Sequence, residues 1–136
     1  MFQLHPYLIF HGRAQEAINF YGKALNLEAR LFETYASSGQ EHSAEQAEWI
    51  MHAELYLNDT CIAMVCDQPQ TEATHFIPVQ LSLNYTDLAE MTTAFEQLST
   101  GGKVTLPLAE QFWGAHFGML TDPFGIAWMM NCEAKK

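Results

Sequence analysis

The stretch HAELYLNDTCIAMVC, residues 52–66, decides the fold because a related stretch follows later in the chain. The second copy is HFGMLTDPFGIAWMM, residues 116–130, at a constant offset that aligns His52 with His116 and Ile62-Ala63 with Ile126-Ala127. Each copy has two apolar runs separated by turn residues, Asn-Asp in the first and Asp-Pro-Phe-Gly in the second. Such runs predict paired β-strands. The sequence therefore predicts a β-hairpin that occurs twice.

The segments before the two hairpins repeat as well. Residues 14–25 and 88–98 carry apolar side chains at steps of three and four, which predicts amphipathic helices, and the two stripes match at an offset that aligns Ala14 with Leu88. Thr86 or Asp87 is the expected N-cap of the second helix, and Gly101-Gly102 its end. A strand is expected on either side of each helix, over residues 3–12, 28–35, 77–85 and 103–109.

The difference in residue number between the two copies is larger for the helices than for the hairpins. The reason is a longer loop in the first copy, over residues 37–48, between its helix and its hairpin. The sequence thus predicts an α+β fold in which residues 1–136 form a single domain of two tandem βαβββ modules, residues 1–70 and 71–136. Each module covers one face of its sheet with a helix and leaves the other face open. Two open faces together form a curled mixed sheet around a groove, a natural ligand pocket.

Composition narrows the class of partner. The net charge of −10, with only six Lys and Arg, argues against a nucleic-acid partner and leaves room for a cationic ligand. No apolar run approaches the ~20 residues that cross a bilayer, and the N-terminal stretch lacks the pattern of a signal peptide, so a cytoplasmic protein without a membrane partner is expected. Cys61, Cys66 and Cys132 follow no metal or redox spacing and are interpreted as buried free thiols.

Several motifs carry a family resemblance. They are PYLIF at residues 6–10, the helix with Ala14, Ala17, Phe20 and Tyr21, MHAEL at residues 51–55, and the ending FWGAHFGMLTDPFGIAWMMN at residues 112–131. Over essentially the whole chain the sequence resembles the PhnB-like family of the vicinal oxygen chelate (glyoxalase/bleomycin resistance/dioxygenase) superfamily. The resemblance implies the two-module fold, a homodimer with grooves near the subunit interface, and small-molecule binding or catalysis. Many enzymes of this superfamily hold a divalent metal with four side chains.

The resemblance places those four metal-ligand positions at Pro6, Pro78, Val65 and Met129. Proline, valine and methionine side chains do not supply the oxygen and nitrogen donors that Ni²⁺, Zn²⁺, Mn²⁺ or Fe²⁺ require. His5 is one residue from the first position, so a regular strand turns it to the opposite face, and only a β-bulge would bring it back. The sequence therefore predicts no metal cofactor at the standard site, with His52, Glu54 and His116 as an unorthodox alternative.

Strand alternation predicts which side chains face the groove. If the helices cover the face of Val79, Leu81 and Leu83, the opposite face carries Gln80 and Ser82. In the hairpins, Ala53 and Leu55 suit the helix side, which leaves His52, Glu54 and Tyr56 for the groove. His116 takes the place of His52 in the repeat, and Gly118 that of Glu54. The predicted ligand-binding residues are His52, Glu54, Tyr56, Gln80, Ser82, Phe112, Trp113, His116 and Met129.

Each of these residues also has a purely structural interpretation. His52 and Glu54, two apart on a strand, form either an acid–base pair or ordinary strand-edge contacts to water and loop carbonyls. Phe112 and Trp113 either cap the groove for a flat or cationic ligand, or Trp113 packs against the other module or a second subunit. Trp128, one residue before Met129, is expected in the core beneath a helix.

The sequence thus predicts a small-molecule-binding protein without the standard metal site, whose unidentified organic ligand is compatible with a positive charge. The alternative is an enzyme of lyase, isomerase or dioxygenase type that uses His52, Glu54 and His116 as catalytic candidates, with or without a metal. A structural or regulatory dimer without a ligand is the third interpretation. Nucleophile motifs and phosphate-binding loops are absent from the sequence, so hydrolase and kinase functions have no support.

Overall fold

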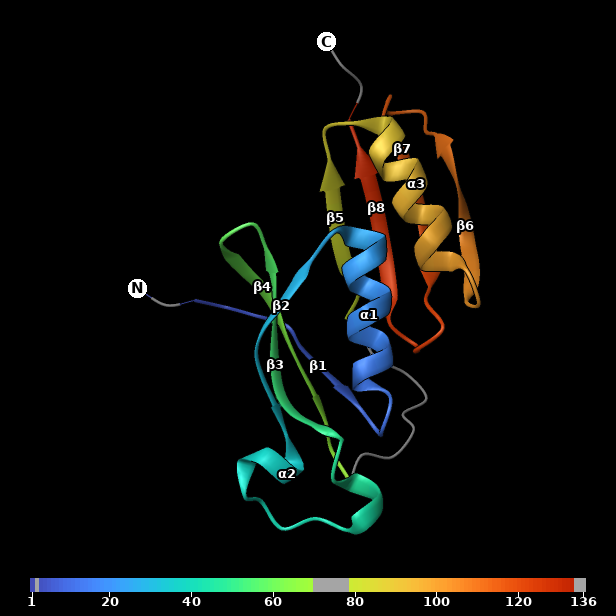
Figure 1. The fold of residues 1–136 in the computed structure, drawn as a ribbon. Coiled ribbons are helices and arrows are strands. Elements are labelled where there is room, and N and C mark those ends of the chain that lie inside the picture. The colour runs from blue at the N-terminus through green and yellow to red at the C-terminus, as the bar shows by residue number, and fades with distance from the viewer. Residues whose placement is uncertain (2, 70–78, 134–136) are drawn as a thin grey trace. The chain divides into compact units, whose positions relative to one another are not determined.

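The computed structural model describes residues 1, 3–69 and 79–133. The chain divides into two compact units, Met1–Ala73 and Thr74–Lys136. Each unit holds one four-stranded sheet, with strand order β1-β4-β3-β2 in unit one and β5-β8-β7-β6 in unit two (Figure 1). In both sheets the first strand pairs parallel with the last, and the other pairs are antiparallel. This is the α+β architecture of two tandem modules that the repeat predicts.

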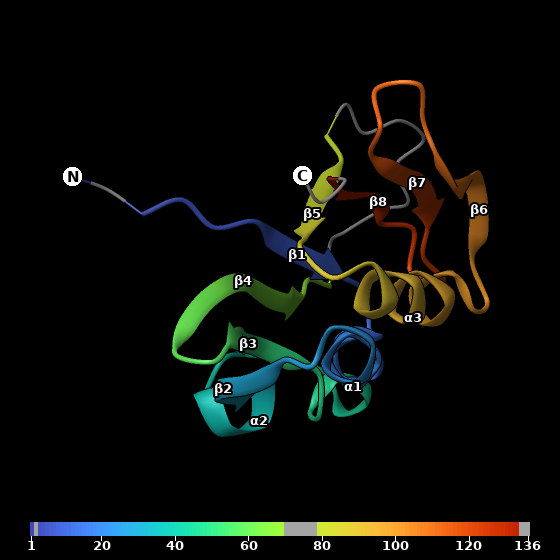
Figure 2. The same cartoon turned by 90° about the horizontal axis from the view of Figure 1, so that it is seen from above.

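Unit one is built in the order strand, helix, strand, hairpin. Its strands are β1 (Tyr7–Phe10), β2 (Glu28–Thr34), β3 (Ile50–Leu57) and β4 (Thr60–Asp67), and its longer helix is α1 (Ala14–Leu25). Figure 2 looks along α1 and shows this helix on one face of the curved sheet. The predicted stripe of α1 is buried at Ala14, Ala17, Ile18 and Tyr21. The sheet meets it with the buried side chains of Leu8, Phe10, Ala53, Leu55 and Val65.

A buried carboxylate connects three segments of unit one. Asp67, at the end of β4, is 1% exposed. One of its oxygens accepts hydrogen bonds from the backbone N–H groups of Gly12 (2.8 Å) and Ala14 (3.0 Å), and the other from that of Ile50 (3.0 Å). Asp67 therefore satisfies N–H groups at the start of α1 and at the start of β3, which α1 and β3 leave unpaired within themselves.

Unit two repeats the order with β5 (Leu81–Tyr85), α3 (Leu88–Ser99), β6 (Lys103–Glu110), β7 (His116–Thr121) and β8 (Ala127–Cys132). Asp87 is the N-cap of α3, and its carboxylate accepts from the N–H groups of Ala89 and Glu90. The buried face of α3 consists of Met91, Ala94, Phe95 and Leu98. Trp128 is buried in the core, as predicted, and its indole N–H donates to the buried carboxylate of Asp122 at 2.8 Å.

Three details differ from the sequence prediction. The segment 37–48, expected as a loop, contains the end of the short helix α2 (Tyr35–Ser38), capped by Thr34, and a 3₁₀ turn at Ala44–Gln46. Both are stabilised by side-chain caps, which a search for apolar stripes does not detect. Val79 lies before β5 and is 63% exposed, so it is not on the helix-covered face. Leu88, expected in the α3 stripe, is 39% exposed.

Among the described residues, none of the helices has the length and the apolar character needed to span a bilayer.

Candidate functional site

A chain of hydrogen bonds crosses the face of unit one that α1 does not cover. The Tyr7 hydroxyl on β1 lies 2.8 Å from Nδ1 of His52 on β3. Nε2 of His52 lies 3.4 Å from Oε2 of Glu54, and the Tyr56 hydroxyl donates to Oε1 of the same carboxylate at 3.0 Å. The side chains of His52 and Glu54 are 28% and 13% exposed, so they are shielded from water yet reachable. Four polar side chains thus form one connected site.

Strand geometry explains why these residues meet. Residues two apart on a strand share a face, so His52, Glu54 and Tyr56 lie opposite the buried Ala53 and Leu55. Strand β4 lies between β1 and β3, and its Met64 is the register partner of both Tyr7 and Glu54. The long Tyr7 side chain reaches across β4 to His52. The structure therefore brings His52, Glu54 and Tyr56 together on the open face, and their role toward a ligand stays a prediction.

The surroundings keep both tyrosines in their neutral form. Burial first, and then the charge and hydrogen bond of Cys66, raise the pKa of Tyr7 above its ordinary value. The hydrogen bond to Glu54 first, then burial and the negative charge of Glu54, raise the pKa of Tyr56. Each phenol therefore keeps its proton at neutral pH, so each hydroxyl brings one proton to the hydrogen-bond chain.

Arg30 lies at the end of the site formed by Tyr56. Its guanidinium carbon lies 4.3 Å from the centre of the Tyr56 ring, a cation–π contact. The same guanidinium binds the Glu28 carboxylate at 3.1 Å, the Asp59 carboxylate at 3.4 Å and the Asn58 carbonyl at 3.2 Å. Arg30 therefore fixes β2 to the tip of the β3–β4 hairpin, and its charge is already met by two carboxylates.

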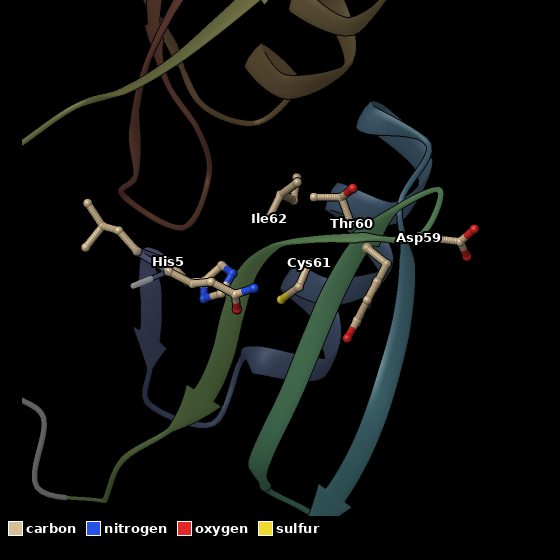
Figure 3. Close-up of a pocket in the computed structure, with 8 residues that line it drawn as sticks. His5, Asp59, Thr60, Cys61 and Ile62 are labelled. Carbon is tan, nitrogen blue, oxygen red and sulfur yellow. The ribbon is translucent and has the colours of Figure 1, made fainter. Parts of the chain in front are cut away.

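A pocket of about 670 Å³ opens beside Tyr56 (Figure 3). It is lined by residues 3–5 of the N-terminal segment, by Tyr56, and by residues 59–62 of the hairpin. Figure 3 shows Asp59 at the hairpin tip, pointing away from His5 and Cys61. Burial, followed by the negative charge of Glu54, raises the pKa of the Cys61 thiol, so this sulfur stays protonated at neutral pH. The pocket is thus mixed in character, with hydroxyl, thiol, imidazole and aliphatic groups.

The second hairpin does not present His116 as predicted. A Cβ on Gly118 would meet the Phe95 side chain of α3 at 2.9 Å, so this side of β7 faces the helix. His116 is two residues away and, by strand alternation, lies on the same side. The reason is register: the pair Gly118 and Met130 corresponds to Ala53 and Val65, one position away from the alignment read in the sequence. A slip of one residue exchanges the two faces of a strand.

The open face of unit two carries both polar and apolar side chains. Ser82, Met129 and Met119 are register partners across β5, β8 and β7, and Ser82 is exposed while Met129 is half-buried. Gln80 is exposed but lies before β5. Phe112 and Trp113 are 97% and 54% exposed, and the Trp113 ring packs edge-on against Phe112 and Phe117 at centroid distances of 4.9 and 6.1 Å. His116 and His52 lie in different units, and their joint action stays a prediction.

The residues at the metal-ligand positions do not fit a divalent metal. Val65 is fully buried on the α1 side, so its placement on the groove face was wrong for the same reason of register. Met64 is the residue of β4 on the open face, beside Tyr7 and Glu54, and a thioether is a poor ligand for hard divalent ions. Pro78 lies outside the described residues. Across residues 1, 3–69 and 79–133, no three His, Cys, Asp or Glu side chains cluster as a metal site requires.

Sequence reasoning missed Tyr7 and Arg30. The apolar strand that contains Tyr7 gives it no special role, although its alternation against the buried Leu8 and Phe10 would have placed it on the open face. Arg30 sits on the irregular strand β2, where Leu31 has a φ of 51° and the register with β3 shifts after Arg30. The alternation of a regular strand does not predict the direction of a side chain at such a bulge.

Known proteins resemble this chain along nearly its whole length. A sequence profile of the Glyoxalase/Bleomycin resistance protein/Dioxygenase superfamily matches residues 3–130. The chain is 31% identical to Protein YjdN of Escherichia coli (strain K12), over 94% of the chain and 93% of that protein. Protein PA1353 from Pseudomonas aeruginosa has a TM-score of 0.84 at 35% identity, covering 99% of this chain and 100% of that one.

The PhnB protein from Bacillus cereus has a TM-score of 0.81 at 26% identity, covering 96% of this chain and 99% of that one. The tandem modules, the profile match and these relatives agree with the motifs read from the sequence. This chain therefore belongs to the glyoxalase/bleomycin resistance protein/dioxygenase superfamily, also known as the vicinal oxygen chelate superfamily, and is a PhnB-like member of it.

Proposed function

We propose that this protein binds a small organic molecule on the open face of unit one, with side chains rather than a metal ion as its contacts. The observation that carries this proposal is the hydrogen-bonded chain of Tyr7, His52, Glu54 and Tyr56 beside a pocket of about 670 Å³. A few converging polar groups at a concave, partly apolar surface are typical of small-molecule sites. Tyr56 belongs to both the chain and the pocket wall, so it connects the two.

Charge favours a cationic ligand. Glu28, Glu54 and Asp59 surround this end of unit one, whereas Arg30 is the cation among them and is bound to two of these carboxylates. The protein as a whole has a net charge of −10. A cation approaching this face is therefore attracted, and an anion would have to displace an existing ion pair. The homodimer and the cytoplasmic location inferred from sequence are part of this proposal.

A second candidate is metal-free acid–base catalysis. The contact between His52 and Glu54 favours it, because a carboxylate that holds an imidazole orients it for proton transfer. The reaction would be of the isomerase or lyase type, in which a proton moves between substrate and side chain. A catalytic role of His116 beside His52 and Glu54 stays a prediction. Turnover that His52→Ala abolishes without loss of the fold would favour the enzyme, and binding without turnover would favour the binding protein.

Replacing Glu54 with glutamine is expected to weaken any ligand found by a thermal-shift screen of small organic amines, alcohols and carboxylates. The exchange removes the charge and leaves one oxygen to serve both His52 and Tyr56. Affinity should fall about tenfold, which is ~1.4 kcal/mol, and the loss should be largest for amines. Glu45→Gln, an exposed change of the same charge in unit one, is the control and should leave affinity unchanged. Equal affinities for both variants would place the ligand elsewhere.

Purified protein without an affinity tag is expected to contain far less than one equivalent of Ni, Zn, Mn or Fe. The donor positions offer proline, valine and methionine side chains, which bind these ions weakly. Elemental analysis before and after soaking with each metal tests this, and His52→Ala/His116→Ala is the matched variant. Stoichiometric metal in the natural protein that disappears from the double variant would contradict the proposal and favour a metal-dependent enzyme.

A further inference from the structure

We propose that the site receives a hydrogen-bond donor of the ligand, an ammonium or hydroxyl group, on the hydroxyl oxygen of Tyr7. This inference rests on the proposed function, because it names the chemical group that the open face of unit one selects. It follows from the direction of the hydrogen bonds in the chain Tyr7–His52–Glu54–Tyr56.

The carboxylate of Glu54 fixes that direction. An ionised carboxylate only accepts hydrogen bonds, so both of its partners here must donate. Tyr56 donates its hydroxyl proton to Oε1, and Nε2 of His52 donates to Oε2 across the longest contact of the chain, 3.4 Å. A neutral imidazole carries one N–H, so with Nε2 protonated the Nδ1 atom has only a lone pair. Nδ1 must therefore accept the proton of Tyr7.

Tyr7 is left with acceptor capacity alone. Its single proton points to His52, so its oxygen offers only lone pairs to a further partner. The Cys66 sulfur is a second acceptor near this hydroxyl, because its hydrogen bond with Tyr7 raises the pKa of the phenol, and it takes none of the lone pairs of the Tyr7 oxygen. Tyr7 is 45% exposed and lies two residues from His5, which lines the pocket. The Tyr7 end of the hydrogen-bond chain thus favours N–H and O–H groups of a ligand over carbonyl or carboxylate oxygens.

Protonation of His52 reverses this polarity. An imidazolium donates from both nitrogens, so Nδ1 would donate to Tyr7 and the Tyr7 proton would turn outward. The titratable groups around His52 and Tyr7 come from every neighbouring element: Glu33 on β2, which is the register partner of His52, Tyr35 on α2, Glu54 on β3 and Cys66 on β4. A charged His52 should therefore weaken the preference for donor ligands.

Three probes of one shape test this inference: benzylamine, benzyl alcohol and benzaldehyde, added to the full chain and followed by amide NMR shifts of residues 5–10 and 52–56. At neutral pH, benzylammonium and benzyl alcohol are expected to bind about tenfold more tightly than benzaldehyde, since one hydrogen bond to this acceptor is worth roughly that factor. Tyr7→Phe should remove the preference. Tyr85→Phe, the same deletion of a hydroxyl in unit two, should preserve it.

A measurement without ligand supports or overturns the same inference. Long-range ¹H–¹⁵N spectra should show His52 with a proton on Nε2 and none on Nδ1, and Tyr7→Phe should change the Nδ1 shift. A proton on Nδ1 in the neutral protein would overturn the proposed direction. If all three probes bind this face equally, the binding function stands and the donor preference is wrong. If none perturbs it, the proposed function fails as well.

Discussion

Asp67→Ala is expected to destabilise unit one by about 3–5 kcal/mol. The variant leaves the N–H groups of Gly12, Ala14 and Ile50 without their buried acceptor, and each unsatisfied buried donor costs roughly 1–3 kcal/mol. The removed carboxylate also leaves a space in a region that is 1% exposed. Urea unfolding followed by the backbone NMR signals of residues 7–67 measures the loss in this unit separately from unit two.

Two further variants test whether the lost hydrogen bonds of Asp67 cause this destabilisation. Asp67→Asn keeps one accepting oxygen and should lose less stability than the alanine variant. Asp59→Ala removes an exposed carboxylate of the same unit, whose pair with Arg30 is weakened by the surrounding water, and should change the midpoint little. A loss for Asp67→Ala no greater than that for Asp59→Ala would show that water replaces the carboxylate and that the three segments hold together without it.

Gly102→Ala is expected to destabilise unit two by about 3 kcal/mol, through overpacking against backbone rather than through backbone conformation. A Cβ at this position would overlap the carbonyl oxygen of Thr121 and approach Cα of Asp122 to 3.0 Å. These are main-chain atoms at the start of the β6–β7 pairing, where Lys103 is the register partner of Thr121, so they cannot rotate away. Chemical unfolding followed by backbone NMR of residues 81–132 measures the loss.

Gly125→Ala separates the two effects that a glycine can have. Gly125 has a φ of 93° and nothing within 4 Å of its Cβ position, so alanine there meets only the cost of left-handed backbone, about 1–2 kcal/mol. Gly102 has no such φ, and its cost is steric. Gly102→Ala should therefore be the more damaging of the two changes. The reverse order would mean that β6 shifts away from β7 at little cost.

The local elements of this protein are largely predictable from its sequence. The stripe of α1 and the alternation along β3 each use a short period, and burial follows that period at Ala17, Tyr21, Ala53 and Leu55. The open-face position of His52, Glu54 and Tyr56 follows from the same alternation. Leu88 and Val79 were misplaced because they lie at element ends, where a helix or strand no longer fixes the direction of a side chain.

The site itself was only half predictable. Alternation showed that His52 and Glu54 share a face, but Tyr7 is distant from His52 in sequence, and only the register of β1, β4 and β3 brings its hydroxyl within 2.8 Å of the imidazole. His116 shows the opposite case. Its alignment with His52 is convincing in sequence, yet the second hairpin pairs one position out of step with that alignment, and His116 turns toward the side of α3.

The sequence by itself determined the two tandem modules, their helices and hairpins, and the family, because these depend on short-range periodicity and on motifs read along one strand or helix. Only the tertiary structure decided which side chains of each repeated strand lie on the open face of its sheet. It also decided which side chains, distant in the sequence, come into contact. The physical reason is that a sheet has a period of two, so one residue of register exchanges its faces without changing the apparent pattern of the sequence. Strand pairing across the sheet sets that register, and with it the polar chain of Tyr7, His52, Glu54 and Tyr56.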